Sequence, residues 1–100
     1  MQSGNYFDRD LINILNVLSL LRDKPMTYDE LWKSGCFKRE KHLEIVIHKL
    51  HKAGCIERIK AVKIWVILGS GITLLSLFPD WRPLPVEVLD IIKPLGWNRI

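Results

Sequence analysis

Cysteine is scarce in this chain, and the features of a secreted protein are missing. The two cysteines, Cys36 and Cys55, flank a stretch that reads as one helix over residues 38–53. At ~1.5 Å per residue this helix would be about 24 Å long, which holds the two thiols beyond disulfide reach. The first residues also lack the basic start and the cleavage site of a signal peptide. We therefore expect reduced thiols and an intracellular, cytoplasmic protein.

The chain also lacks an uncharged run long enough to cross a membrane. Residues 64–78 read IWVILGSGITLLSLF and carry no charge, but a membrane-spanning helix needs ~20 apolar residues. Gly69-Ser70-Gly71 splits this run, which predicts a buried strand, a turn and a second apolar element. Residues 72–78 fit a short helix and a strand equally well. We expect no membrane partner.

Motifs of catalysis are absent too. The sequence contains no phosphate-loop pattern and no nucleophile elbow. Capping and helix-dipole effects explain the acidic residues near the predicted helix ends, which are Asp8, Asp10, Asp23, Asp29 and Glu30. We expect a protein that is not an enzyme, that needs no cofactor and that has no identifiable small-molecule ligand.

One spacing is compatible with a metal site. His48, His51 and Cys55 recur at i, i+3 and i+7, which could place three ligands along one edge of a helix. Gly54 ends the predicted helix before Cys55, so the line of ligands is broken. We therefore predict no metal site.

What the chain does have is a concentrated positive charge. Its 100 residues, 48% of them hydrophobic, fit one small globular domain. The net charge is +4, but the segment 33–63 holds nine Lys or Arg and three Glu, so it carries +6 and the remainder −2. All three histidines lie in the same segment. Such a local basic field indicates a phosphate-bearing partner, and the alternative is a solvated face with no partner.

The amino-terminal half predicts two helices. Residues 1–7 are expected to form a flexible arm. The segment 8–22 predicts an amphipathic helix whose apolar residues are Leu11, Ile12, Ile14, Leu15, Val17, Leu18, Leu20 and Leu21. So wide an apolar surface requires cover on more than one side, from the core or from a dimer contact. A second, short helix follows Thr27, which has capping-box spacing to Glu30, and Gly35 suits the left-handed position after its last turn.

A third helix and a hairpin follow. The helix spans 38–53, with an apolar stripe of Leu43, Val46, Ile47 and Leu50, and Gly54 ends it. Two strands are predicted over 55–60 and 63–68, with a short connection that lacks the usual Gly or Asn. Residues 79–100 are expected to be a Pro-rich extension with a short helix after Pro85.

This order of helix, capped helix, turn, helix and hairpin resembles the winged helix-turn-helix superfamily, in particular the small DNA-binding regulators of the MarR and ArsR types. The segment 47–58, IHKLHKAGCIER, is similar to the end of the family's recognition helix and its first wing strand. The resemblance implies a mainly α fold with a small β-hairpin (α+β). It divides the chain into a winged helix-turn-helix domain over 8–78, with a three-helix core and a wing, and a C-terminal extension over 79–100 that could serve in dimerisation.

The resemblance also implies a function. The chain would bind double-stranded DNA sequence-specifically as a homodimer and regulate transcription, with helix 38–53 in the major groove and the wing 55–68 beside it. The residues expected to contact DNA are Lys38, Arg39, Lys41, His42, Ile45, His48, Lys49, Lys52, Arg58, Lys60 and Lys63. Ile45 could contact a thymine methyl group or a protein, and Glu44 could accept from a cytosine amino group.

A protein-interaction adaptor without DNA binding is the alternative function. Four tryptophans in 100 residues (Trp32, Trp65, Trp81 and Trp97) together with Ile45 would suit such a role. Binding to phosphates would weaken steeply with added salt, whereas binding to an apolar partner would barely respond.

Overall fold

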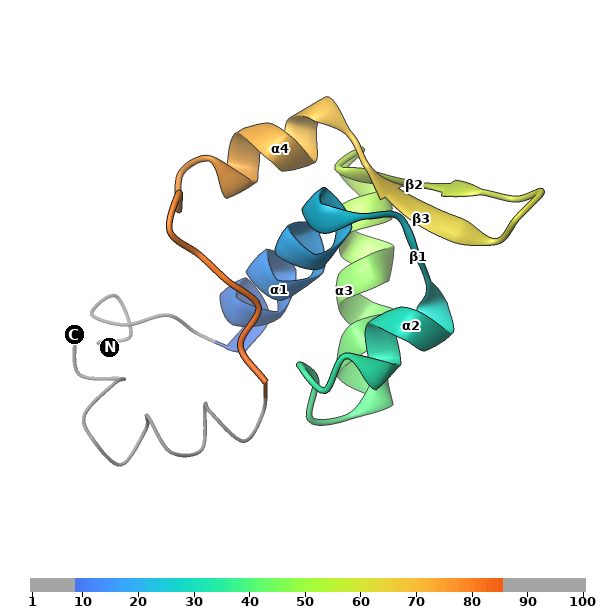
Figure 1. The fold of residues 1–100 in the computed structure, drawn as a ribbon, viewed down its shortest axis with the longest axis horizontal. Coiled ribbons are helices and arrows are strands. Elements are labelled where there is room, and N and C mark those ends of the chain that lie inside the picture. The colour runs from blue at the N-terminus through green and yellow to red at the C-terminus, as the bar shows by residue number, and fades with distance from the viewer. Residues whose placement is uncertain (1–8, 86–100) are drawn as a thin grey trace.

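The computed structural model describes residues 9–85, which form a mixed α+β fold (Figure 1). Its elements are α1 (Arg9–Asp23), β1 (Met26–Thr27), α2 (Tyr28–Lys33), α3 (Glu40–Lys52), β2 (Ile56–Ile59), β3 (Ile64–Ile67) and α4 (Gly69–Leu75). The strands of the described part form one antiparallel sheet in the order β1-β3-β2. The predicted arm over 1–7 and the predicted helix after Pro85 lie outside the described residues.

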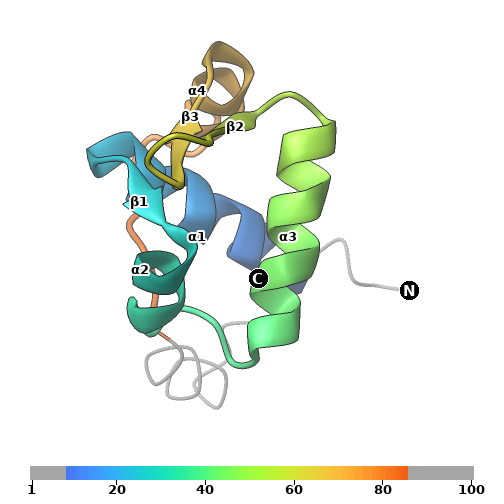
Figure 2. The same ribbon diagram turned by 90° about the vertical axis from the view of Figure 1, so that its right-hand side faces the viewer.

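Helix α1 is the centre of the core. Leu15, Val17 and Leu18 are completely buried, because α1 packs against α3, α4 and β3. In Figure 2 it lies behind and between α2 and α3, with the hairpin above. The expectation that this helix is covered on more than one side is confirmed, and the cover comes from other parts of the same chain.

The short helix α2 begins as its sequence predicts. Thr27 Oγ1 accepts from the Glu30 amide at 3.1 Å, and Glu30 Oε1 accepts from the Thr27 amide at 2.9 Å. Gly35 follows the helix with φ +79°, the left-handed conformation that glycine tolerates best. Met26 and Thr27 have a second role that was not predicted, because as β1 they pair with Trp65 and Ile64 of β3.

Helix α3 is shorter than the predicted range of 38–53. Lys38 and Arg39 lie ahead of it, and Arg39 has an extended backbone as the N-cap residue, with φ −135° and ψ 145°. The helix dipole accounts for this start, since its positive end disfavours two cations in the first turn and favours the carboxylate of Glu40. The predicted apolar stripe is buried, and Gly54, with φ +78°, ends the helix as expected.

The hairpin matches the predicted strands to within one residue at each end. Its register pairs Ile56 with Ile67 and Arg58 with Trp65. The connection over 60–63 contains no glycine, and Lys63 adopts the left-handed backbone conformation in its place, with φ +56°.

The turn predicted at Gly69-Ser70-Gly71 is wrong, because these residues form the start of α4. A Cβ at Gly71 would lie 2.5 Å from the Cys55 carbonyl oxygen and 3.0 Å from Leu18 Cδ2, so this glycine permits close packing and does not make a turn. The ambiguous run 72–78 is helical up to Leu75. Within residues 9–85 no helix is both long and apolar enough to cross a membrane.

The segment after α4 returns along α1 and is held there by Asn16. Asn16 Oδ1 accepts from Trp81 Nε1 at 3.1 Å and from the Leu84 amide at 3.0 Å, and Asn16 Nδ2 donates to the Leu84 carbonyl at 3.3 Å. Asn16 is fully buried, and its amide satisfies the backbone of an extended segment much as a neighbouring strand would. No local sequence pattern indicates this contact, since the partners lie 65 to 68 residues apart.

Candidate nucleic-acid interface

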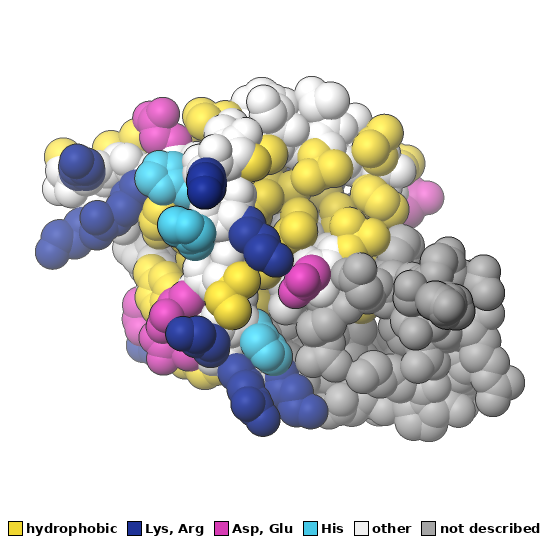
Figure 3. All heavy atoms as spheres, turned by 180° about the vertical axis from the view of Figure 1, so that it is seen from behind, with side chains coloured by type: hydrophobic (Ala, Val, Ile, Leu, Met, Phe, Trp, Pro, Cys, Tyr) yellow, Lys and Arg dark blue, Asp and Glu magenta, His cyan; other side chains and the backbone are white. Residues whose placement is uncertain are grey.

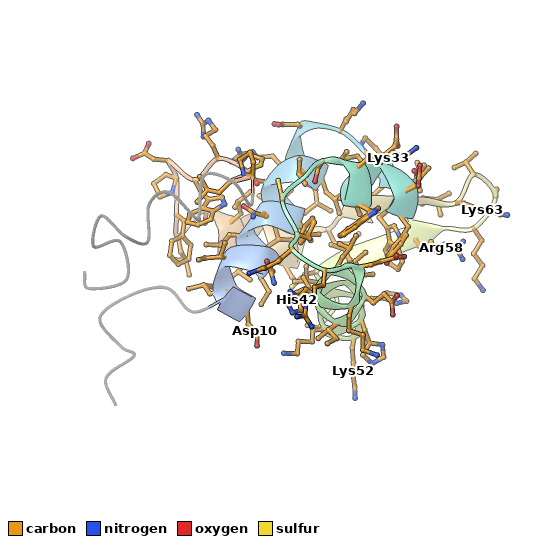
Figure 4. All side chains as sticks on the ribbon, turned by 90° about the horizontal axis from the view of Figure 1, so that it is seen from below. Asp10, Lys33, His42, Lys52, Arg58 and Lys63 are labelled. Carbon is orange, nitrogen blue, oxygen red and sulfur yellow. The ribbon has the colours of Figure 1, made fainter. Side chains whose placement is uncertain are left out.

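The outward face of α3 is the most prominent surface among the predicted site residues. At 100° per residue, one stripe lies opposite the buried one and consists of Lys41, Ile45, His48 and Lys52, all of which are exposed. We call these four residues the outer ridge. Figure 4 shows α3 nearly end-on, with Lys52 directed away from the rest of the molecule.

The flank of α3 that faces α1 holds two of the predicted residues. Lys49 Nζ forms an ion pair with Asp10 Oδ2 at 3.4 Å, so part of its charge is already compensated. His42 is half-buried, and its Nδ1 is buried without a hydrogen-bond partner. Figure 4 shows His42 on the side of α3 toward Asp10. These two side chains are therefore less available to a ligand than those of the outer ridge.

The opposite flank is tied to α2. The Tyr28 hydroxyl donates to Glu40 Oε2 at 3.0 Å. Burial raises the pKa of Tyr28 to about 12, with further contributions from the hydrogen bond to Glu40 and from the negative charges of Glu40 and Glu44. Glu44 follows Glu40 by four residues and so lies on the same flank of α3, beside the outer ridge and not on it. The hydrogen bond to Tyr28 holds the first turn of α3 in place.

The far end of α3 is packed against the hairpin. The rings of His51 and Trp65 meet edge to face, with centroids 5.3 Å apart and an interplanar angle of 78°. Arg58 pairs directly with Trp65 in the sheet register, and directly paired residues project from the same face of a sheet. Arg58 therefore lies on the face of the hairpin that meets the end of α3.

The cations of the hairpin extend the basic surface beyond α3. Arg58, Lys60 and Lys63 are exposed, and Lys60 and Lys63 belong to the connection between the strands. Figure 3 shows Lys, Arg and His side chains gathered over α3 and the hairpin. Farther from the hairpin on the same face, hydrophobic side chains dominate the described surface. Two further predicted cations, Lys38 and Arg39, are exposed just before α3 begins.

Most of this charge has no protein counterion. Among the predicted site residues, Lys49 is the one that forms an ion pair within the described part of the chain. Free cations arranged along a helix and an adjacent hairpin can bind a row of phosphates.

Metal binding and thiol chemistry are two other possibilities for the described residues. Over residues 9–85, no three His, Cys, Asp or Glu side chains are grouped so that they could hold a metal ion. Cys36 and Cys55 are both free and buried, and burial raises the pKa of the Cys36 thiol, which makes it less reactive.

Sequence reasoning missed three contacts that shape the interface, those of Asp10, Tyr28 and Trp65. Each joins α3 to an element distant in sequence, so no local pattern could have indicated it. Comparisons of the chain with protein-family models, with curated proteins and with solved structures found no match. Its function is therefore inferred from α3 and the hairpin themselves.

Proposed function

We propose that this chain is a winged helix-turn-helix protein that binds double-stranded DNA sequence-specifically and regulates transcription. The order α1, α2, α3, β2 and β3 agrees with the element order that the sequence resemblance implies. In this proposal α3 is the recognition helix, and the hairpin β2–β3 is the wing.

The observation that carries the proposal is the outer ridge together with the free cations of the hairpin. From Lys41 to Lys52 the ridge extends about 16 Å along the helix axis at ~1.5 Å per residue. A helix of ~10–12 Å diameter fits the major groove, which is ~12 Å wide. With the ridge in the groove, Lys41 and Lys52 reach toward phosphates on the groove walls, and Arg58, Lys60 and Lys63 approach the backbone beside it.

Charge removal on the ridge tests the proposal. Each phosphate contact contributes about 0.9 to the slope of log affinity against log salt concentration. The double variant Lys41→Ala/Lys52→Ala should therefore bind duplex DNA more weakly and lower the magnitude of that slope by about 2, as measured by fluorescence anisotropy across a salt series.

A matched control is available on the same chain. Lys24 and Lys33 are exposed cations outside α3 and the hairpin, and Figure 4 shows Lys33 on the other side of the molecule from Lys52. The variant Lys24→Ala/Lys33→Ala removes the same net charge and should leave the slope nearly unchanged. Equal effects of the two double variants would contradict the assignment of the ridge.

We also propose that the protein acts as a homodimer. Helix α1 is covered by other elements of its own chain, whereas Ile72 and Leu77, at α4 and just after it, are 52% and 70% exposed. A two-fold dimer would set two copies of α3 about one duplex turn, ~34 Å, apart and would require a near-palindromic site. Selection of bound sequences from a random duplex pool should recover two inverted half-sites at that spacing, and unrelated single sites would contradict the dimer.

A protein-interaction adaptor is the second candidate, and exposed Ile45 in the middle of the ridge is the observation that favours it. The same salt series separates the two functions. A slope near zero, with a protein partner that protects Ile45, would support the adaptor.

A further inference from the structure

We infer that Ile45 recognises the C5-methyl group of a thymine in the major groove and so determines sequence preference. This inference rests on the proposed DNA binding and adds the chemical group that is read. It concerns the one residue of the outer ridge that cannot contact a phosphate.

Ile45 does not belong to the hydrophobic core of the described residues. The residue is 39% exposed, and it belongs neither to the buried core nor to the half-buried hydrophobic residues packed against that core. The other large exposed hydrophobics of the described residues are Ile59, Val62, Ile72 and Leu77, and none of these is on α3. A β-branched residue is also a weaker helix former than Lys, Gln or Glu, so helix stability does not account for it.

The neighbours of Ile45 on the ridge are polar and mostly cationic. Lys41 precedes it by four residues and His48 follows it by three, so each lies about one helical turn away, at about 6 Å and about 4.5 Å along the axis. Lys52 lies a further turn beyond His48. Ile45 is therefore a single apolar spot with basic or potentially basic groups on both sides.

The charge pattern distinguishes between possible occupants. An apolar protein surface placed on Ile45 would have to desolvate Lys41 and Lys52 or supply acidic groups on both sides of its contact. The major groove of DNA has the complementary pattern, since the thymine methyl is an apolar group on the groove floor and phosphates line both walls. The deep, narrow major groove of double-stranded RNA offers no such contact, because side chains cannot read it.

The test uses uracil, which differs from thymine only by the missing methyl group. In a duplex obtained by selection, each thymine is replaced singly by uracil, and affinities are measured for the wild-type protein and for Ile45→Ala. At one position per half-site the wild type should lose about fourfold in affinity, which corresponds to ~0.8 kcal/mol for one buried methyl-sized group. Ile45→Ala should bind the two duplexes equally at that position.

Two further arms establish that the methyl group and Ile45 are the cause. A duplex with 5-methylcytosine at the sensitive position should bind the wild type about fourfold more tightly than one with cytosine. Val62→Ala, which truncates an exposed hydrophobic residue at the hairpin connection, should retain the preference for thymine over uracil.

The outcomes separate this inference from the proposed function. If the wild type binds a selected duplex with a steep salt dependence but tolerates uracil at every position, Ile45 does not read a methyl group and DNA binding stands. Retention of the thymine preference by Ile45→Ala would also overturn the inference. If the wild type binds no duplex at all, both the inference and the proposed function fail.

Discussion

Replacing Gly71 with alanine tests how α4 is held against the domain. Gly71 is buried in the first turn of α4. An added Cβ would lie 2.5 Å from the Cys55 carbonyl oxygen, 2.8 Å from Ile67 Cγ1 and 3.0 Å from Leu18 Cδ2. These three contacts belong to three different parts of the core, so no single side-chain movement can relieve them.

The magnitude follows from two opposing effects. Alanine in place of glycine stabilises a helix by up to ~1 kcal/mol. Overpacking a core costs about 1–3 kcal/mol, and the upper end applies here, because the Cys55 carbonyl also accepts from the Leu68 amide at 2.9 Å and cannot move freely. We expect a net loss of about 2 kcal/mol, which for a domain of this size lowers the melting temperature by roughly 8–16 °C.

Gly69 provides the matched control in the same helix. It is exposed, and a Cβ there would meet nothing within 4 Å. Gly69→Ala should therefore leave the free energy of unfolding unchanged or raise it by up to ~0.5 kcal/mol. Urea denaturation followed by circular dichroism measures both variants. If Gly71→Ala proved as stable as Gly69→Ala, the close packing of α4 on Cys55 would be refuted.

Two other contacts make separate predictions. Asn16→Leu removes the three hydrogen bonds to Trp81 and Leu84, each worth about 1 kcal/mol, so the Leu84 amide should exchange with solvent at least about fivefold faster by NMR; unchanged exchange would contradict the contact. The raised pKa of Tyr28 means that the folded state holds this proton more tightly, so its contribution to stability is present below pH 10 and is lost as the pH rises toward 12. In a spectrophotometric titration, Tyr28→Phe should remove the tyrosine that ionises near pH 12, and persistence of that transition would assign it elsewhere.

Features that depend on near neighbours in sequence were predicted well. The capping box at Thr27 and Glu30, the left-handed glycines at 35 and 54 and the buried stripe of α3 all involve residues within about one or two helical turns of each other. Backbone conformation and side-chain periodicity at that range follow from steric and hydrogen-bonding rules that need no knowledge of the rest of the fold.

Features that depend on distant neighbours were mispredicted or missed. The pattern Gly69-Ser70-Gly71 predicts a turn, because the close approach of Cys55 that requires Gly71 has no sequence signal. The two-residue strand β1 exists only through its pairing with β3. Asn16 would be an ordinary helix residue without the returning segment at Leu84.

Some features of the candidate interface are likewise visible in the sequence, and others depend on tertiary contacts. The concentration of Lys, Arg and His between residues 33 and 63 is visible in the sequence, and the 3.6-residue period of α3 already separates the outward side chains from the buried ones. Which outward residues remain free was decided by other elements, since Asp10 pairs with Lys49 and the packing around His42 buries its Nδ1.

The sequence alone therefore determined the identity of α3, its apolar stripe and its positive charge, because these depend on composition and on contacts within one helix. The tertiary structure decided that Lys49 and His42, on the flank of α3, are less available than the ridge residues, and that Arg58 lies toward the end of α3. The physical reason is that the availability of a side chain depends on what packs beside it, and here those neighbours come from α1, α2 and the hairpin.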